Sequence, residues 1–501
     1  MKRSAGILMP VSSLPSKYGI GCFDETAYRF IDWLKEAGQT YWQILPLVPT
    51  SYGDSPYQSF STFAGNPYFI SLDWLTGEGL LTAEETAAVD FGSKDDDIDY
   101  AKLYEGRYPL LRKAYERSHI NDNGDFHRFV NENSWWLEDY ALFMALKDFF
   151  GGKCWNEWPE DIKLRYGYAI EHYRNKLYFD IEFQKFLQYK FDCQWKDLKY
   201  YANSQGIQIV GDIPIFVASD SVDAWTNTEL LQFDENCVQT ASAGVPPDAF
   251  SATGQLWGNP LYDWDRMEKD GYAWWIKRIK ASFRLSDVIR IDHFRGFEAY
   301  WRVPQGEETA INGEWIKGPG QKFFDTVKKE LGPSLPIIAE DLAVITEEVE
   351  ALRDNNGLPG MKILQFAFGF NENGDFDTTN EYLIHNIGEV SVAYTGTHDN
   401  NTTVGWYRSL DDRTKDIVRR YFECSDEEVL WKMIRALLMS NAMWVIIPMQ
   451  DILGLGEEAR MNVPSTCGSS NWSWKMRAED ITSPSFGGIK YYSSLYGRSG
   501  S

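Results

Sequence analysis

Charged side chains end several short apolar runs in this sequence of 501 residues. Asp often follows a strand as a turn residue or as the cap of the next helix, and this would explain any single acid. It does not explain all of them, because Glu is not a favoured cap and Arg290 lies inside its run. We therefore interpret these residues as a candidate site. They are Asp212 in "GDIPIF", Arg290, Asp292 and His293 in "VIRIDHF", Glu340 and Asp341 in "PIIAEDL", and His398 and Asp399 in "YTGTHD".

Several carboxylates with an arginine and one or two histidines suit two kinds of chemistry. Carboxylate oxygens bind divalent metals such as magnesium or calcium. Alternatively, two carboxyl groups can cleave a glycosidic bond, one as nucleophile and the other as proton donor, about 5–5.5 Å apart in retaining enzymes. The second chemistry requires that the two pKa values differ.

The surroundings of Asp292 and Glu340 predict such a difference. Side chains alternate along a strand, so Arg290 and Asp292 share one face. The cation would keep Asp292 ionised, whereas Glu340, beside Asp341 and among other acids, would keep its proton. Glycosidic chemistry needs two distinct environments and a metal site does not, so we favour the glycosidic site.

Two loop-like segments combine aromatic residues with Gly, Pro, Asn, Ser and Gln. They are "SYGDSPYQSFSTFAGNPYF" (51–69) and "PPDAFSATGQLWGNPLYDW" (246–264). Aromatic faces beside fixed hydrogen-bond donors suit neutral sugar rings, which offer C–H faces and hydroxyl edges. Most of the 20 Trp residues would fill the core, but Trp257, with glycine and polar residues around it, fits a sugar site better.

The elements that must position these residues alternate in type along the chain. Apolar runs bounded by turn residues predict buried parallel strands, with helix-length segments between most of them. The alternation predicts an α/β fold, a (β/α)8 TIM barrel, whose site lies at the C-terminal ends of the strands. A doubly wound sheet is the alternative, because alternation does not show closure. The predicted strands are 40–47, 67–75, 206–216, 287–294, 336–342, 361–368, 390–399 and 442–453.

Two segments are too long to be simple connections between strands. Residues 76–205 show charged helical patterns, and residues 217–286 hold Gly, Pro, Asp and Trp in irregular order. No Pro- or Ser-rich linker brackets them, so we predict one catalytic barrel over 1–501 with a mainly helical insertion and an irregular insertion that carries a substrate loop. The run "KDDDIDY" (94–100) is interpreted as a solvated surface loop rather than a calcium site.

Composition limits the class of partner. The net charge of −24 argues against nucleic acid and against anionic membranes. Six cysteines without a CxxC pair are typical of reduced thiols. The start "MKRSAGILMPVSSLP" resembles a signal peptide only briefly, because Pro10 interrupts a short apolar part. We expect a cytoplasmic protein with an uncharged or small partner.

The chain resembles the amylomaltases, or 4-α-glucanotransferases (disproportionating enzymes), of glycoside hydrolase family 77 in the α-amylase clan. The resemblance runs nearly end to end; its long loop motifs mark the family and its short strand-end motifs mark the clan. One departure is "NVPST", where members usually read "NVPGT", so that Ser465 stands at the position of a glycine. The motifs are "SSLPSKYGIG", "YWQILPL", "YGDSPYQSFSTFAGNPY", "GDIPIFVASDSVDAW", "PPDAFSATGQLWGNPLYDW", "RIDHFRGFEAYWRVP", "AEDL", "GTHDNNT" and "RMNVPSTCGSSNWSW".

The resemblance implies a role for each site residue. Asp292 would be the nucleophile, Glu340 the general acid/base and Asp399 the transition-state stabiliser. Arg290 would orient Asp292. The remaining substrate-binding residues would be His398 and Asp212 on hydroxyls of the donor-site sugar, Tyr57 and Trp257 on the glucan chain, and Asn462 in a loop near the cleft.

The implied reaction is a retaining double displacement on maltooligosaccharides and other α-1,4-glucans, with release of glucose. It needs no metal and no organic cofactor, and we expect a monomer or a weak homo-oligomer. Three alternatives stay open on sequence grounds. They are a hydrolase of the same clan that uses water as acceptor, a non-catalytic glucan-binding protein, and a metal-dependent barrel enzyme.

Overall fold

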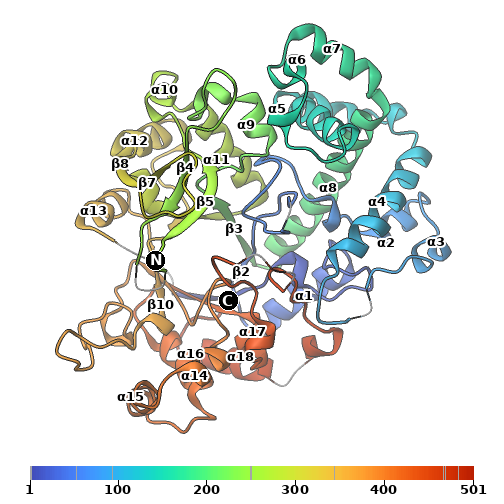
Figure 1. The fold of residues 1–501 in the computed structure, drawn as a ribbon. Coiled ribbons are helices and arrows are strands. Elements are labelled where there is room, and N and C mark those ends of the chain that lie inside the picture. Colours follow the sequence, from blue (N-terminus) through green and yellow to red (C-terminus); the bar gives the residue numbers. More distant parts are fainter. Residues whose placement is uncertain are drawn as a thin grey trace.

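Eight parallel strands form a closed barrel, which confirms the predicted fold class (Figure 1). The computed structural model describes residues 3–51, 53–92, 94–248, 251–342, 345–466, 468, 470–482 and 485–500. Around the barrel the strand order is β1-β12-β11-β10-β9-β6-β3-β2. The strands are β1 (Ser4–Leu8), β2 (Tyr41–Gln43), β3 (Gln208–Pro214), β6 (Val288–Asp292), β9 (Ile337–Ala339), β10 (Gly360–Ile363), β11 (Ser391–Tyr394) and β12 (Trp444–Pro448).

The first strand of the barrel was not among the predicted ones. β1 is the run "SAGIL", whose five residues are all buried, and it pairs with β12 and β2. Gly6 allows the close approach to β2, because a Cβ there would lie 2.6 Å from the carbonyl oxygen of Tyr41. The apolar residues that resemble the start of a signal peptide are therefore a barrel strand.

The predicted strand at 67–75 is wrong. Residues Pro67–Phe69 form a 3₁₀ turn and Leu72–Gly77 form the helix α2. Asn66 and Ser71 explain this, because their side chains accept hydrogen bonds from the backbone N–H groups of Tyr68 and Trp74 as helix caps. An apolar run of this length does not by itself distinguish a buried strand from a buried helical turn.

Helices cover the outside of the barrel, and α1 shows how an apolar stripe turns inward. In α1, Ala27, Phe30, Ile31 and Leu34 are fully buried at helical spacing, and the Asp24 side chain caps the first turn. Residues 364–390 interrupt the alternation, because they contain two 3₁₀ turns and no α-helix. The outer helices are α1 (Glu25–Glu36), α11 (Ala273–Leu285), α12 (Gly320–Leu331), α13 (Glu347–Asn355), α15 (Asp412–Phe422), α16 (Val429–Met439) and α18 (Ser485–Leu495), with the short α14 (Thr403–Ser409) and α17 (Met449–Leu453) after β11 and β12.

The long connection between β2 and β3 is helical. Its two longest helices, α5 and α8, pack along one another at the side of the barrel in Figure 1. Besides α2, the helices of this connection are α3 (Ala83–Ala87), α4 (Tyr100–Arg117), α5 (Gly124–Phe149), α6 (Glu160–Lys163), α7 (Gly167–Lys176) and α8 (Tyr178–Ser204).

The connection between β3 and β6 contains regular structure that its composition did not indicate. Two of its strands join two later ones in a sheet of order β5-β4-β7-β8. The elements are α9 (Val222–Thr226), β4 (Ala241–Val245), β5 (Gln255–Pro260), α10 (Trp264–Lys269) and α11, followed after β6 by β7 (Ala299–Pro304) and β8 (Glu314–Lys317).

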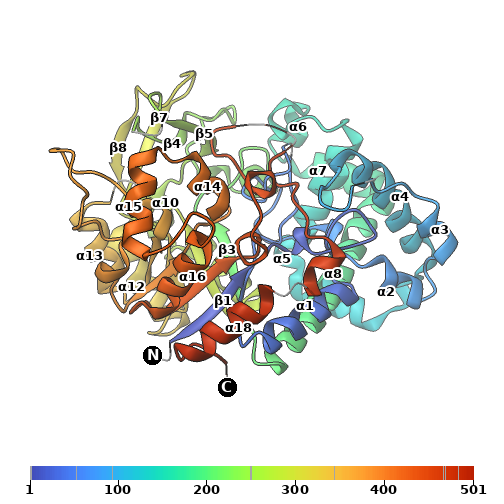
Figure 2. The same ribbon diagram turned by 90° about the horizontal axis from the view of Figure 1, so that it is seen from below.

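The two ends of the chain meet below the barrel (Figure 2). The guanidinium of Arg498, which has no exposed area, donates to the carbonyl oxygen of Ser4 at 3.2 Å and to that of Leu438 at 2.7 Å. These bonds connect the C-terminal residues to β1 and to the end of α16. Within the described part of the chain, no helix has the length and apolar character to cross a membrane.

Candidate active site

Strand order and register bring Asp292 and Glu340 together at the mouth of the barrel. β6 and β9 are neighbours, and Ile291 pairs with Ala339. Asp292 ends β6 and Glu340 directly follows β9, so the two acids continue this register on adjacent strands, which lie about 4.8 Å apart in a sheet. The backbone holds them there, because the Glu340 N–H donates to the Ile291 carbonyl at 3.0 Å.

Arg290 lies inside the barrel and is 2 % exposed. Its Nη1 donates to both oxygens of Asp212, at 2.9 and 2.8 Å, and its Nη2 lies 3.0 Å from Oδ1 of Asp292. β3 and β6 are paired with Asp212 opposite Arg290, which sets up the first contact. Ile289 and Ile291 point out of the barrel, toward the surrounding helices, and are fully buried there. Side chains alternate along the strand, so Arg290 and Asp292 both point into the barrel, which explains why a cation and an anion stand at the end of an apolar strand.

The pKa values of Asp292 and Glu340 are both raised, and to different extents. Burial raises the pKa of Asp292 to about 6, although Arg290 acts to lower it. Burial and the charge of Asp292 raise the pKa of Glu340 to about 8. The predicted effect of Arg290 on Asp292 has the expected sign, but burial outweighs it. Near pH 7 the arrangement favours an ionised Asp292 beside a protonated Glu340.

The neighbour of Glu340 in sequence does not share its site. Asp341 is buried on the other side of the strand, where it pairs with Arg353 of α13 and accepts from the Met361 N–H at 2.7 Å. Its negative charge is thus compensated, and it contributes less to the pKa of Glu340 than Asp292 does. The Glu340 carboxylate itself accepts from the backbone N–H of His293 at 2.6 Å.

Asp399 sits beside His398 on the loop that follows β11. Nε2 of His398 lies 3.3 Å from Oδ2 of Asp399, and Nδ2 of Asn462 donates to Oδ1 at 2.7 Å. Burial acts to raise the pKa of Asp399, but these two partners hold it well below its usual range. Burial likewise acts to lower the pKa of His398, and Asp399 raises it above its usual value. The Asp399 side chain is 42 % exposed and ionised.

Tyr57 and Trp257 supply the aromatic surfaces expected from the loops. The ring of Tyr57 stacks on that of His398, with centroids 5.1 Å apart and planes at 13°. Its hydroxyl donates to Asp212 at 2.8 Å, so Tyr57 connects β3 with the loop after β11. Trp257, on β5, is half-buried and meets the ring of His293 edge to face at 4.8 Å.

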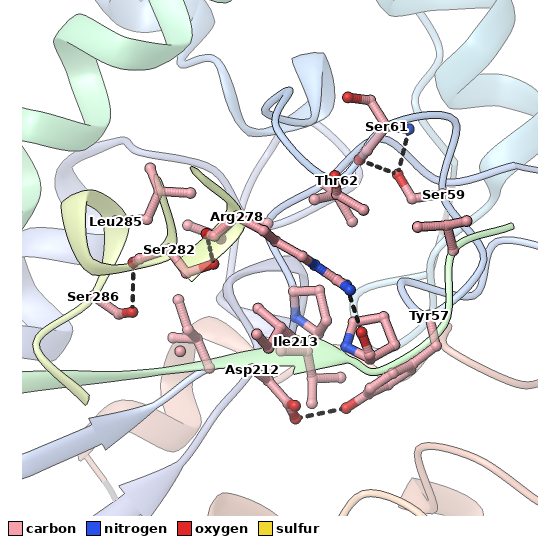
Figure 3. A pocket seen from close by; sticks show the side chains of 18 of the residues that line it. Tyr57, Ser59, Ser61, Thr62, Asp212, Ile213, Arg278, Ser282, Leu285 and Ser286 are labelled. Atoms are coloured by element: carbon pink, nitrogen blue, oxygen red, sulfur yellow. Dashed lines mark hydrogen bonds between the residues drawn. The ribbon is translucent and has the colours of Figure 1, made fainter. Parts of the chain in front are cut away.

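A small cavity lies beside Tyr57 and Asp212 (Figure 3). Arg278 reaches across it from α11. Its guanidinium donates to the carbonyl of Pro214 and, at 2.9 Å, to that of Ile215. Its volume of about 50 Å³ is enough for one or two water molecules, whereas ligand pockets are typically several hundred cubic ångströms. This cavity is therefore too small to be a ligand pocket.

All nine site residues inferred from the sequence lie at this end of the barrel, but not all of them are exposed there. Asp212 has no exposed side-chain area, since Arg290 and Tyr57 occupy its oxygens. Among the described residues, no three His, Cys, Asp or Glu side chains are grouped to hold a metal ion. The acids are engaged by arginine, histidine, tyrosine and amide groups instead.

Three residues that hold the site together were not predicted. Arg460 donates to the carbonyls of Asp399 and Asn462, at 2.9 and 2.8 Å. Asp451, which is 1 % exposed, accepts from the hydroxyls of Thr395 and Thr403 and so closes the loop that carries Asp399. The third is Trp472. Arg460 and Trp472 stand in the motif "RMNVPSTCGSSNWSW", and that motif was the only available signal.

The departure at Ser465 has a conformational cost. Ser465 adopts φ +64°, the left-handed region that glycine enters freely and other residues disfavour. We expect Ser465→Gly to raise the free energy of unfolding by about 0.5–1 kcal/mol, as measured by urea denaturation. Ser470→Gly is the matched control, because Ser470 has no positive φ and should lose stability. Equal effects of the two substitutions would contradict this explanation.

Comparison with known proteins identifies the family of this chain. A family model described as 4-alpha-glucanotransferase matches residues 9–481. The 4-alpha-glucanotransferase of Streptococcus pneumoniae is 51 % identical over 501 residues, which cover 99 % of this chain and 98 % of that protein. The one from Thermus thermophilus is 46 % identical, with 96 % of each chain covered.

A solved structure has the same fold. The amylomaltase from Streptococcus agalactiae, determined in complex with acarbose, superimposes with a TM-score of 0.95 at 42 % identity, and the match covers 100 % of both chains. Sequence and structure thus agree over the whole barrel and its connections, and the chain belongs to the 4-alpha-glucanotransferase family, glycoside hydrolase family 77.

Proposed function

We propose that this member of the 4-α-glucanotransferase family transfers α-1,4-glucan segments by a retaining double displacement through a glycosyl ester on Asp292. The observation that carries the proposal is the pair formed by Asp292 and Glu340. Asp292 ends β6 and Glu340 directly follows β9, each one residue beyond the pair Ile291–Ala339, and their pKa values are about 6 and about 8. Retaining enzymes need two such carboxyl groups about 5–5.5 Å apart, one ionised and one protonated.

In the first step, a carboxylate oxygen of Asp292 attacks the anomeric carbon of the donor. The bond from that carbon to the glycosidic oxygen breaks, and the proton of Glu340 passes to the leaving oxygen. Asp399, kept ionised by His398 and Asn462, supplies negative charge next to the oxocarbenium-like transition state. Arg290 holds Asp292 in place for the attack through its 3.0 Å contact.

In the second step, Glu340 accepts the proton of the 4-hydroxyl of an acceptor glucan. That oxygen attacks the anomeric carbon, and the ester bond to Asp292 breaks. The new glycosidic bond has the configuration of the original one, because two inversions have occurred. With maltotriose as donor and acceptor, the products are glucose and longer maltodextrins.

The donor sugar would bind against Tyr57 and His398, with Trp257 and Asn462 nearer the rest of the glucan. Tyr57 offers a ring face fixed by its stacking and its bond to Asp212. Because the carboxylate of Asp212 has no exposed area, we propose that it acts on the sugar through Tyr57 and Arg290 rather than directly. The related amylomaltase from Streptococcus agalactiae was solved in complex with acarbose, which supports the proposal that this chain binds an oligosaccharide-like ligand.

The setting we propose is the cytoplasm, with the protein acting as a monomer or a weak homo-oligomer on maltooligosaccharides. The five cysteines that the structure describes are free thiols, which is typical of proteins in a reducing compartment. The net charge of −24 does not hinder the binding of neutral glucans, whereas it opposes nucleic acids and anionic membranes.

Incubation with maltotriose followed by chromatography of the products tests the function. Transfer produces glucose and maltodextrins longer than maltotriose, while the number of reducing ends stays constant. A rise in reducing ends without longer products would show a hydrolase, and glucan binding without turnover would show a binding protein. Activity that a chelator abolishes would show a metal-dependent enzyme.

The pH dependence of kcat/KM for glucose release from maltotriose should be bell-shaped. Activity falls below about pH 6, where Asp292 takes up a proton, and above about pH 8, where Glu340 loses its own. With α-maltosyl fluoride as donor the basic limb of the glycosylation step should vanish, because fluoride leaves without a proton. A basic limb that is equally steep for both donors would contradict the assignment of Glu340.

A further inference from the structure

The acidic run at 94–100 is paired with a distant segment of the chain. The Ile98 N–H donates to the Ser473 carbonyl at 2.8 Å, and the Lys475 N–H donates to the Asp96 carbonyl at 3.1 Å. Asp97 and Trp474 form an antiparallel bridge between these two bonds. The run is a surface loop, with Lys94, Asp95 and Asp99 exposed, but its backbone also pairs with residues 473–475 and so joins the helical connection to a later part of the chain.

Charges of opposite sign accompany this pairing. Arg477 forms an ion pair with Asp96, and the Lys475 side chain, only 3 % exposed, lies close to the acids of the run. On the other side, the Ser13 hydroxyl donates to the carbonyl of Trp474 at 2.8 Å. The segment 472–477 is thus fixed between the acidic run and the loop that follows β1. We call the paired segments 96–100 and 472–477 the latch.

Trp472 is the residue of the latch whose side chain contacts the candidate site. Its backbone is in the left-handed region, at φ +63°, which a bulky side chain enters only when its surroundings impose it. The hydroxyl of Tyr100 donates to its carbonyl at 2.8 Å, and its own N–H donates to the carbonyl of Met461 at 2.7 Å. These contacts hold the unfavourable conformation.

The indole ring of Trp472 packs against the two rings of the proposed donor site. Its centroid lies 5.7 Å from that of Tyr57 and 5.9 Å from that of His398. Trp472 is 7 % exposed, so its ring serves as a backing for Tyr57 and His398 more than as a surface for sugar. His398 in turn contacts Asp399.

We propose that Trp472 is a positioning residue for His398 and Asp399, and that the latch, through Tyr100, keeps its ring in place. The proposal rests on the roles assigned above to His398 and Asp399. It makes the helical residues 76–205 between β2 and β3 part of the catalytic apparatus, although none of the nine site residues lies in that segment. Small displacements of a catalytic group are sufficient to cost roughly 10²-fold in rate, so the effect should appear in kcat.

Two substitutions test the proposal. Trp472→Gly removes the ring while glycine accepts the left-handed backbone, and we expect kcat for transfer from maltotriose to fall roughly 10²-fold with KM within about twofold. Tyr100→Phe removes the hydrogen bond within the latch from the Tyr100 hydroxyl to the Trp472 carbonyl and should lower kcat about threefold to tenfold. Trp472→Phe retains an aromatic ring and should recover most of the activity.

The control is Tyr104→Phe, one turn further along α4, where the side chain is 61 % exposed. Each kcat is divided by the fraction of active enzyme, titrated through the covalent intermediate, so that unfolded protein does not contribute. Normal kcat in both Trp472→Gly and Tyr100→Phe, or an equal loss in Tyr104→Phe, would overturn the latch proposal. Substantial activity of Asp292→Asn in the same assay would instead overturn the proposed function on which it rests.

Discussion

Asp292→Asn is expected to lower kcat for transfer from maltotriose by at least roughly 10⁴-fold. An amide cannot attack the anomeric carbon, but it is isosteric with the carboxylate and keeps an acceptor oxygen for Arg290. Arg290 also keeps both bonds to Asp212, so the fold should be unchanged. Glucose release is measured by chromatography, and folding by circular dichroism and thermal unfolding.

The control for this substitution is Asp180→Asn. Asp180 also pairs with an arginine, Arg112, at 2.8 Å, and its side chain is 44 % exposed, but it lies in the helical connection on α8. Asp180→Asn should keep the activity of the wild type. Activity of Asp292→Asn within about tenfold of wild type, confirmed with Asp292→Ala to exclude deamidation, would show that the nucleophile is another group.

Glu340→Ala should separate the acid from the nucleophile. We expect a loss of roughly 10³–10⁴-fold with maltotriose, whose leaving group needs a proton. With α-maltosyl fluoride, whose leaving group needs none, formation of the ester on Asp292 should stay close to the wild-type rate. Added azide can then take the place of the activated acceptor, and the product should be α-maltosyl azide, with retained configuration.

The contrast with Asp292→Asn makes this result specific. Asp292→Asn should be inactive with both donors and should not respond to azide. Two outcomes would contradict the assignment. In the first, Glu340→Ala is as inactive with α-maltosyl fluoride and azide as it is with maltotriose. In the second, Asp292→Asn is active with the fluoride. A β-configured azide product would show inversion and would contradict the double displacement itself.

The polar ends of the strands were predictable, because strand geometry is local. Alternation along "VIRID" places Arg290 and Asp292 on one face, and parallel strands deliver their ends to one mouth. The acids of β6, β9 and the loop after β11 could therefore be expected to meet. β1 was not predictable in the same way, because five residues without a preceding helix resemble many other apolar runs.

The order of the two pKa values could be predicted, but the upward shift at Asp292 could not, because Arg290 was expected to lower that pKa and burial outweighs it. Asp341 stands next to Glu340 in the sequence, yet its pairing with Arg353 takes it out of the site. Burial, which depends on the whole fold, is the larger cause of both shifted pKa values. Burial and the charge of Asp292, rather than the charge of Asp341, therefore explain the raised pKa of Glu340.

The contacts that support Trp472 depend on pairing between segments that are hundreds of residues apart in the sequence. Nothing in "KDDDIDY" indicates that its backbone pairs with 473–475, and Trp472 could be noticed only as part of a family motif. Ser465 is an intermediate case. Its motif indicated a glycine position, and the positive φ gives the physical reason.

Trapping of the glycosyl ester is the most direct test of the central claim, that Asp292 is the nucleophile. Glu340→Ala is incubated with α-maltosyl fluoride without acceptor, digested at low pH and analysed by mass spectrometry. Because this variant lacks the base for the second step, the ester should accumulate, with one maltosyl group per chain located on Asp292 in peptides spanning 288–297. A maltosyl group on any other residue, or turnover of the fluoride without a labelled peptide, would contradict the account.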